Sequence, residues 1–103
     1  MILSNDQGNN HTKKSVRVLI TGRVQRVWFR GWTAEQATGL GLQGWVRNLS
    51  DGRVEAVFSG HEADVDTMID LCWQGPRNAE VEAVTAATTD PPAEKGFQVW
   101  RKS

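Results

Sequence analysis

Short segments of the chain alternate apolar and polar residues. In residues 16–22, valine and isoleucine alternate with polar residues, which is the pattern of a strand with one buried face. Residues 43–49 and 53–60 flank an Asp-Gly pair, which supplies the backbone freedom of a tight turn and predicts a β-hairpin. Residues 80–89 and 97–102 read as two further strands. The pattern therefore predicts five strands.

Two other segments have apolar residues at helical spacing. The first helix is predicted over residues 32–42, with its start near Arg30 and its end at neighbouring glycines. The second is predicted after Ser59 and Glu62, which have the spacing of a capping box, and before Gly75. The resulting order is β-α-β-β-α-β followed by an extra C-terminal strand. This order predicts an α+β fold, a ferredoxin-like sandwich with two helices packed on one face of a mostly antiparallel sheet.

Length and charge narrow the classes of protein. The 103 residues suffice for one domain but not for two separate cores. Twelve Lys and Arg residues balance twelve Asp and Glu residues, so no net charge attracts the chain to nucleic acid or to a membrane. Residues 1–14 are mostly polar and are predicted to form a disordered tail, which leaves residues 15–103 as the domain. Any anion site in that domain has to be local.

Cysteine usage and the lack of long apolar runs bear on location. Cys72, the single cysteine, cannot form an internal disulfide or a Cys-rich zinc site, which suits a reducing compartment. No segment has the apolar core of a signal peptide or the roughly 20 apolar residues of a membrane span. We therefore expect a soluble cytoplasmic monomer with Cys72 in its core.

Two segments look like phosphatase motifs but do not fit them. The Asp-x-Asp pair in residues 64–68 lies on a predicted amphipathic helix rather than at the end of an apolar strand. Cys72 and Arg77 are too close in sequence for a thiolate-phosphatase loop. Neither segment is expected to carry chemistry, and both histidines, His11 and His61, are predicted on the surface.

Residues 22–31, Gly-Arg-Val-Gln-Arg-Val-Trp-Phe-Arg-Gly, connect the first predicted strand to the first predicted helix. Successive backbone N–H groups and the positive helix end can there point into one concavity, which suits an oxyanion. Arg30, at the helix start, adds a planar fork of N–H donors that matches two phosphate oxygens. The alternative is that Arg30 only extends into solvent from the helix end, and the residues alone leave both interpretations open.

These residues resemble a known family. The segment 22–30 is similar to the signature loop of acylphosphatases, commonly Gly-x-Val-Gln-Gly-Val-x-Phe-Arg. The segment 44–60, Gly-Trp-Val-Arg-Asn-Leu-Ser-Asp-Gly-Arg-Val-Glu-Ala-Val-Phe-Ser-Gly, resembles the second signature of that family. Both motifs occur in the right order and spacing, and the resemblance covers about residues 16–101. The ferredoxin-like sandwich of the family agrees with the fold predicted above.

The resemblance implies hydrolysis of acyl phosphates to a carboxylate and inorganic phosphate, without metal or cofactor. It also implies a small-molecule substrate and no nucleic-acid or membrane partner. Arg30 matches the catalytic arginine, and Asn48 matches the asparagine that orients the attacking water. The resemblance assigns the phosphate-binding loop to Gln25, Arg26, Val27, Trp28, Phe29 and Arg30. Without the resemblance, the amide of Asn48 at a strand end would be read as satisfying the backbone of the turn.

Arg26 departs from the family pattern, which usually has glycine there. Glycine often permits a positive φ in an anion cradle, and another residue in that conformation costs about 1–2 kcal/mol. Arg26 can be accepted without strain, can distort the loop, or can bring a further cation to the anion. We expect the first outcome, because the side chain can extend to solvent.

Two alternatives come from other functional classes. The same order of elements serves RNA recognition modules, but the strand 53–60 has only Phe58 as an aromatic residue, and the neutral charge does not suit RNA. The second alternative is a non-catalytic phosphate- or anion-binding or regulatory domain of the same fold, for which Arg26 is the main support. Trp28 is expected to border the pocket and to contact the acyl group.

Overall fold

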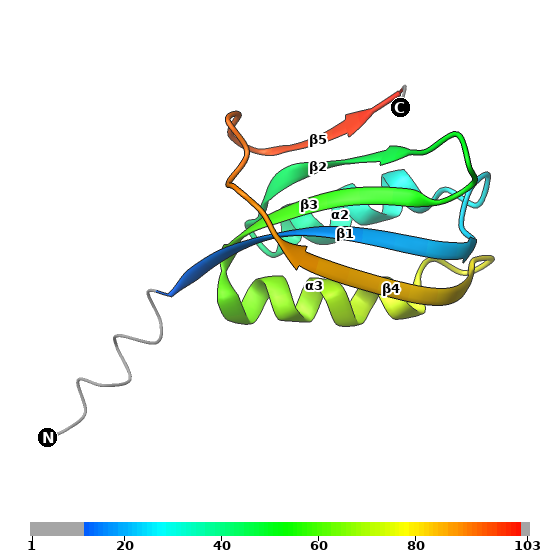
Figure 1. The fold of residues 1–103 in the computed structure, drawn as a ribbon, viewed down its shortest axis with the longest axis horizontal. Coiled ribbons are helices and arrows are strands. Elements are labelled where there is room, and N and C mark those ends of the chain that lie inside the picture. Colours follow the sequence, from blue (N-terminus) through cyan, green and yellow to red (C-terminus); the bar gives the residue numbers. More distant parts are fainter. Residues whose placement is uncertain (1–11, 102–103) are drawn as a thin grey trace, which may run out of the picture.

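A five-stranded sheet with two helices forms the structure, a computed structural model that describes residues 12–101 (Figure 1). The strands are β1 (Lys13–Arg23), β2 (Gln43–Asn48), β3 (Val54–His61), β4 (Glu80–Thr88) and β5 (Phe97–Trp100). The helices are α2 (Phe29–Gly39) and α3 (Glu62–Gln74). The strand order is β4-β1-β3-β2-β5, and all neighbours are antiparallel except β2 and β5. The predicted ferredoxin-like sandwich is therefore confirmed.

Two predicted element starts differ from the structure. Strand β1 begins at Lys13, before the predicted domain boundary, because Lys13 and Lys14 continue the pairing with β3 and Lys14 Nζ lies 2.6 Å from Asp66 Oδ1. Residues 1–11 of the predicted tail, including His11, lie outside the described residues. Helix α2 begins at Phe29, three residues before residue 32, since the buried Phe29 ring fixes its first turn in the core.

The predicted capping box is wrong. Ser59 lies in β3, and its Oγ is 2.7 Å from Ser15 Oγ on the neighbouring strand. Helix α3 is instead preceded by His61, whose side chain makes no capping hydrogen bond. The Ser59 hydroxyl therefore bonds a neighbouring strand instead of capping the helix as the local sequence pattern predicts.

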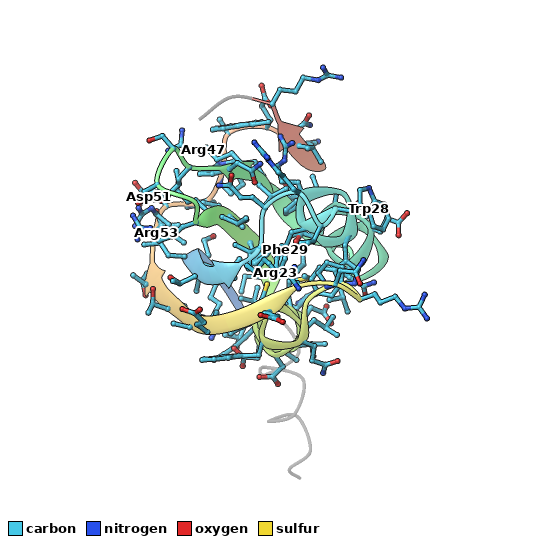
Figure 2. All side chains as sticks on the ribbon, turned by 90° about the vertical axis from the view of Figure 1, so that its right-hand side faces the viewer. Arg23, Trp28, Phe29, Arg47, Asp51 and Arg53 are labelled. Atoms are coloured by element: carbon cyan, nitrogen blue, oxygen red, sulfur yellow. The ribbon has the colours of Figure 1, made fainter. Side chains whose placement is uncertain are left out.

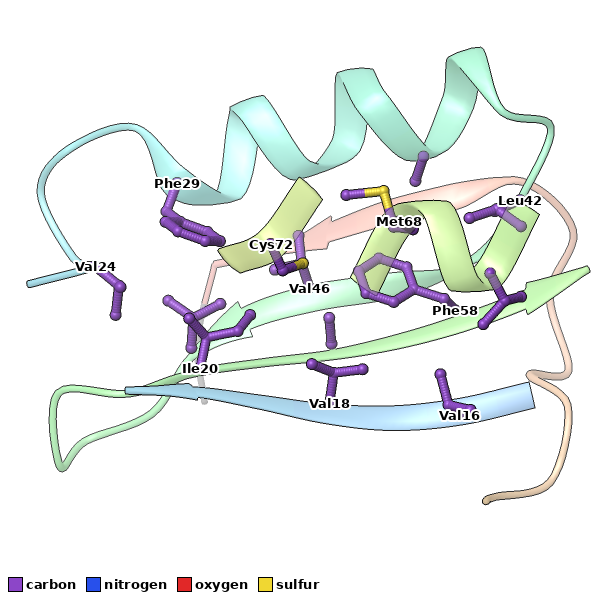
Figure 3. Packing of buried hydrophobic residues seen from close by; sticks show 14 residues of the cluster. Val16, Val18, Ile20, Val24, Phe29, Leu42, Val46, Phe58, Met68 and Cys72 are labelled. Atoms are coloured by element: carbon purple, nitrogen blue, oxygen red, sulfur yellow. The ribbon is translucent and has the colours of Figure 1, made fainter. Parts of the chain in front are cut away.

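The core lies between one face of the sheet and both helices (Figure 3). Alternate residues of the strands, such as Val18, Val46 and Phe58, pack there against Phe29 of α2 and Met68 of α3. Cys72 is also fully buried in this cluster, as predicted. Burial raises the pKa of the Cys72 thiol to about 12, so it is protonated and unreactive at neutral pH.

The opposite face of the sheet carries a buried carboxylate between two arginines. Glu55 is 3% exposed, and it accepts hydrogen bonds from Arg17 Nε and from Arg47 Nε, the latter at 2.6 Å. Burial raises the pKa of Glu55, but the hydrogen bonds from Arg47 and Arg17 outweigh it and hold the pKa below its ordinary value. Arg47 thus joins β2 to β3 on the face of the sheet opposite the core.

Replacing Glu55 with glutamine is expected to lower the free energy of unfolding by about 1–2 kcal/mol at pH 7, since two charge-assisted hydrogen bonds are weakened. Because the pKa of Glu55 is lower in the folded state, ionised Glu55 stabilises the fold fully when the pH is above its unfolded-state pKa of about 4.3. This stabilisation is lost as the pH falls through the folded-state pKa. Urea denaturation at pH 7 and pH 3 measures both effects.

The matched control for this substitution is Glu82→Gln, because the exposed Glu82 has no hydrogen bond or ion pair within the described part of the chain. Its stability is expected to match that of the unmodified protein. If the free energies of unfolding of Glu55→Gln and the unmodified protein differ by the same amount at pH 7 and at pH 3, the ionisation assigned to Glu55 is contradicted.

Candidate active site

A pocket of about 480 Å³ lies at the edge of the sheet where β1, β2 and β5 end. These three strands run in the same direction, because β1 and β2 are both antiparallel to β3 while β5 is parallel to β2. The residues of the β1–α2 loop and of α2 that line it are Val24, Arg26, Trp28, Phe29, Arg30 and Gly31. The residues at the strand ends are Asn48, Val99 and Arg101. The topology thus gathers segments far apart in the sequence; Figure 2 views this edge of the molecule.

The β1–α2 loop is anchored at both ends by buried side chains. Val24 and Phe29 are 0% and 1% exposed, and the Phe29 ring packs edge-on against Trp32 at 5.4 Å between centroids. Between them, Gln25 Nε2 donates to the carbonyl oxygens of Leu49 and Arg53, at 2.8 and 2.9 Å. These contacts fix the loop against the core and against the β2–β3 turn.

The predicted loop residues divide by the direction of their side chains. Arg26, Trp28 and Arg30 line the pocket together with the buried Phe29. Gln25 bonds the β2–β3 turn and Val27 packs against the core, so neither side chain lines the pocket. The side chains of Gln25 and Val27 hold the loop, and only their backbone can face an anion.

Backbone N–H groups are left free along this loop. Within residues 12–101, the first loop or helix-start amide after Arg26 that donates to a backbone carbonyl is that of Trp32, which bonds Trp28 O at 3.0 Å. The first turn of an α-helix leaves its N–H groups without intrahelical partners and carries a partial positive charge. No side chain caps the start of α2, and no acidic residue lies in its first turn. The loop therefore offers donors and positive potential to an anion.

Arg30 is tied to a neighbouring strand by a hydrogen bond. Its Nη1 donates to the backbone carbonyl of Trp100 at 2.9 Å, which joins the start of α2 to the end of β5. A guanidinium has five N–H donors, so this bond leaves others for a ligand. Arg30 thus lines the pocket and bonds the β5 backbone, so it does not only extend into solvent.

Asn48 ends β2 and faces the same pocket. The β2–β3 turn does not use its amide, because Leu49 N–H donates to Arg53 O at 2.8 Å and Arg53 N–H donates to Asp51 Oδ1 at 3.1 Å. In the part of the chain that the structure describes, the Asn48 side chain makes no hydrogen bond. A turn-stabilising role is therefore not supported, and the amide is available to a ligand or to water.

Arg26 and Trp28 both have left-handed backbone conformations, with φ of 65° and 64°. The expectation that Arg26 is free of strain is therefore wrong, because the loop needs the positive φ that glycine adopts without cost. Trp28 is 61% exposed, and a Cβ built on Gly31 would lie 2.1 Å from Trp28 Nε1. The indole thus lies directly against Gly31, at the rim of the pocket (Figure 2).

Replacing Arg26 with glycine is expected to raise the free energy of unfolding by about 1 kcal/mol, because it removes the strain of a positive φ. Urea denaturation measures this change. The control is Arg77→Gly, at an exposed arginine outside the pocket that follows α3 and is absent from the positive-φ residues. An Arg26→Gly variant less stable than the unmodified protein would contradict the assignment of strain to this residue.

Sequence patterns did not identify two of the lining residues at β5. Val99 and Arg101 reach the pocket only because β5 pairs with β2 in parallel, with Val46 opposite Val99. That pairing is long-range, and neither residue lies in the two motifs. Arg23, in contrast, is exposed beside Glu80 at 3.4 Å and does not line the pocket (Figure 2).

Within the part of the chain that the structure describes, the pocket lining includes no carboxylate and no histidine. Among residues 12–101, no group of three or more His, Cys, Asp or Glu side chains is placed to hold a metal ion. In the same residues, neither helix is long and apolar enough to cross a membrane. The arrangement offers arginine and amide donors, together with free backbone N–H groups, to an anionic ligand.

The chain is similar to acylphosphatases in sequence and in structure. The family model described as Acylphosphatase matches residues 16–99. The acylphosphatase of Rhodospirillum rubrum is 50% identical over 84 residues, which cover 82% of this chain and 92% of the relative. That of Haloarcula marismortui is 47% identical over 89 residues, 86% of this chain and 96% of the relative. The solved structure of an acylphosphatase from Coxiella burnetii has a TM-score of 0.82 at 33% identity, covering 85% of this chain and 93% of that one.

Proposed function

The chain belongs to the acylphosphatase family and hydrolyses acyl phosphates, and we propose that the reaction takes place in the pocket lined by Arg30 and Asn48. The observation that supports this site is the meeting of two motif residues, 18 positions apart in sequence, beside free loop amides. The alternative of a non-catalytic anion-binding domain is not favoured, because relatives about 50% identical over most of their length are acylphosphatases.

Arg30 binds the phosphoryl group in this proposal. Its guanidinium is oriented by the Trp100 carbonyl, and its remaining N–H donors match the phosphoryl oxygens as a fork. The amides of the loop and of the first turn of α2 supply further donors. Since these groups are fixed before the substrate binds, they stabilise charge in the transition state with little reorganisation.

Asn48 positions the attacking water. Its amide lies at the end of β2, in the same pocket as Arg30, and the turn beside it is satisfied by other groups. An amide has both an acceptor and two donors, so it can hold a water by one hydrogen bond and direct a lone pair toward phosphorus. This role is positioning rather than proton abstraction, since an amide is not a base near neutral pH.

The chemistry needs little else. The water oxygen forms a bond to phosphorus as the bond from phosphorus to the acyl oxygen breaks, and the carboxylate leaves with the electron pair. A phosphoryl oxygen takes the proton of the water, so the products are a carboxylate and inorganic phosphate. Catalysis then depends on positioning and on stabilising the transferring group. The described residues that line the pocket include no carboxylate or histidine, which agrees with this mechanism.

We also propose that the enzyme acts as a cytoplasmic monomer without a nucleic-acid partner. The neutral net charge supplies no general attraction to nucleic acid, and the free, buried Cys72 suits a reducing compartment.

Hydrolysis of benzoyl phosphate in the presence of a chelator tests the proposed function. The loss of ultraviolet absorbance as benzoate forms gives the rate, and added magnesium gives the comparison. We expect the same turnover in both conditions. A folded protein without turnover, or turnover that requires the metal, would contradict the proposal.

A further inference from the structure

The pocket contains more positive charge than one phosphoryl group requires. Three arginines, Arg26, Arg30 and Arg101, line it, and no carboxylate of residues 12–101 does. Arg26 and Arg101 are exposed, and neither makes a hydrogen bond or an ion pair with the residues that the structure describes. Their charges are therefore not neutralised by these residues and act on whatever enters the pocket.

Arg26 and Arg101 are not needed to supply hydrogen-bond donors to the phosphoryl group. Arg30 and the free amides of the loop supply a fork and several N–H groups, which suffice for three phosphoryl oxygens. The two further guanidiniums come from different segments, Arg26 from the β1–α2 loop and Arg101 from the residue after β5. They add positive charge to the pocket beyond that of Arg30.

The volume and lining of the pocket leave room for the acyl part of a substrate. About 480 Å³ lies within the range of sites that hold whole small molecules. Trp28 and Val99, exposed by 61% and 44%, are apolar parts of the lining. A carbon skeleton can pack on these side chains while its ends meet arginines.

The backbone of Arg26 gives an independent reason to assign it a role. Its φ of 65° is unfavourable for any residue with a Cβ, so arginine is kept at a position where glycine would be more stable. Strain retained at a pocket residue is a reason to look for a function that compensates for it. A cation aimed at a ligand is such a function.

We propose that Arg26 and Arg101 form a second anion subsite, which selects acyl phosphates that carry a further anionic group on the acyl side. This inference rests on the proposed function, because it assumes that the phosphoryl group occupies the donors of Arg30 and the loop. Guanidiniums are charged at all working pH values, and a pocket lined with one sign of charge concentrates ligands of the opposite sign. Substrates with a second negative charge gain this attraction in addition to that of the phosphoryl group.

A matched pair of substrates tests the subsite. Benzoyl phosphate and 4-carboxybenzoyl phosphate share the ring and the scissile bond and differ in one carboxylate. We expect kcat/KM to be at least about threefold higher for the carboxylated substrate, and the difference to shrink in high salt. In Arg26→Gln and Arg101→Gln, the ratio of the two kcat/KM values is expected to fall about threefold. Glutamine keeps the Cβ, so Arg26→Gln retains the backbone strain and changes only the charge.

The control is Arg77→Gln, since Arg77 is exposed, lies outside the pocket and has no partner among the described residues. Its substrate ratio should equal that of the unmodified protein. Equal losses for both substrates in Arg26→Gln and Arg101→Gln would mean that the two arginines serve the phosphoryl group itself, and would overturn the subsite. An unchanged ratio in both variants would overturn it as well.

Binding of benzylphosphonate and 4-carboxybenzylphosphonate, measured by calorimetry, separates this inference from the proposed function. Both compounds resist hydrolysis, so affinity is measured without turnover. Tighter binding of the carboxylated compound that depends on Arg101 supports the subsite even in a protein that hydrolyses neither acyl phosphate. Equal affinities would remove the subsite and leave the hydrolysis of benzoyl phosphate as a separate result.

Discussion

Replacing Arg30 with alanine is expected to lower kcat/KM for benzoyl phosphate by about 10³-fold or more. A positioned arginine contributes on the order of 10³–10⁵ to the rate of phosphoryl transfer. In this structure Arg30 is the pocket arginine whose guanidinium is already fixed by a hydrogen bond, at 2.9 Å from the Trp100 carbonyl. The same substitution should abolish detectable binding of inorganic phosphate in calorimetry, because the fork acts on the substrate as well as on the transition state.

Arg30→Lys distinguishes the shape of this group from its charge. Lysine keeps the positive charge but replaces the planar fork by a single ammonium, which cannot bond Trp100 O and two phosphoryl oxygens with the same geometry. We expect it to recover less than about a tenth of the activity. Arg77→Ala is the control, and circular dichroism checks that each variant is folded. Near-normal turnover by a folded Arg30→Ala variant would refute the assignment.

The position of Arg30 depends on β5, which lies at an edge of the sheet. Two aromatic stacks hold that strand. Trp100 stacks on Trp45 of β2 at 4.2 Å between centroids and 9° between planes, and Phe97 stacks on Phe58 of β3 at 5.7 Å. Aromatic packing on both faces of the sheet therefore fixes the Trp100 carbonyl, which orients Arg30.

The strands and the placement of Asn48 could be predicted from the sequence because the information is local. Alternation puts Val16, Val18 and Ile20 in the core, as the structure confirms. The same alternation puts Asn48 on the side of Val46, and the structure has Val46 in the core and Asn48 in the pocket at its edge. A period of two residues decides these positions without knowledge of the partner strands.

The remaining features depend on contacts that local patterns do not encode. Ser59 has the spacing of a helix cap, but its hydroxyl bonds Ser15 across the sheet. Arg101 joins the site only through the parallel pairing of β5 with β2. The conformation of Arg26 is imposed by the anchored loop, in which the backbone has to turn between two buried side chains. Long-range pairing and a strained turn were thus the parts that the sequence could not reveal.

Asn48→Ala is expected to lower kcat by about 10²–10³-fold while the affinity for inorganic phosphate changes little. Removal of one positioned donor at a reacting centre has an effect of this size. The affinity should persist because Arg30 and the loop amides, not Asn48, hold the phosphoryl group in the proposed mechanism. Steady-state kinetics with benzoyl phosphate and calorimetry with inorganic phosphate measure the two quantities.

A second substitution, Asn48→Asp, keeps the size of the side chain but exchanges the NH₂ donors for a negative charge. If Asn48 only filled space, the aspartate variant would be more active than the alanine variant. We expect it to be at least as impaired, since a carboxylate beside the phosphoryl group repels the substrate. Asn78→Ala, at an exposed asparagine outside the pocket, is the control. Parallel losses of kcat and of phosphate affinity in Asn48→Ala would instead assign Asn48 to substrate binding, and would leave the attacking water to be oriented by the substrate and by Arg30.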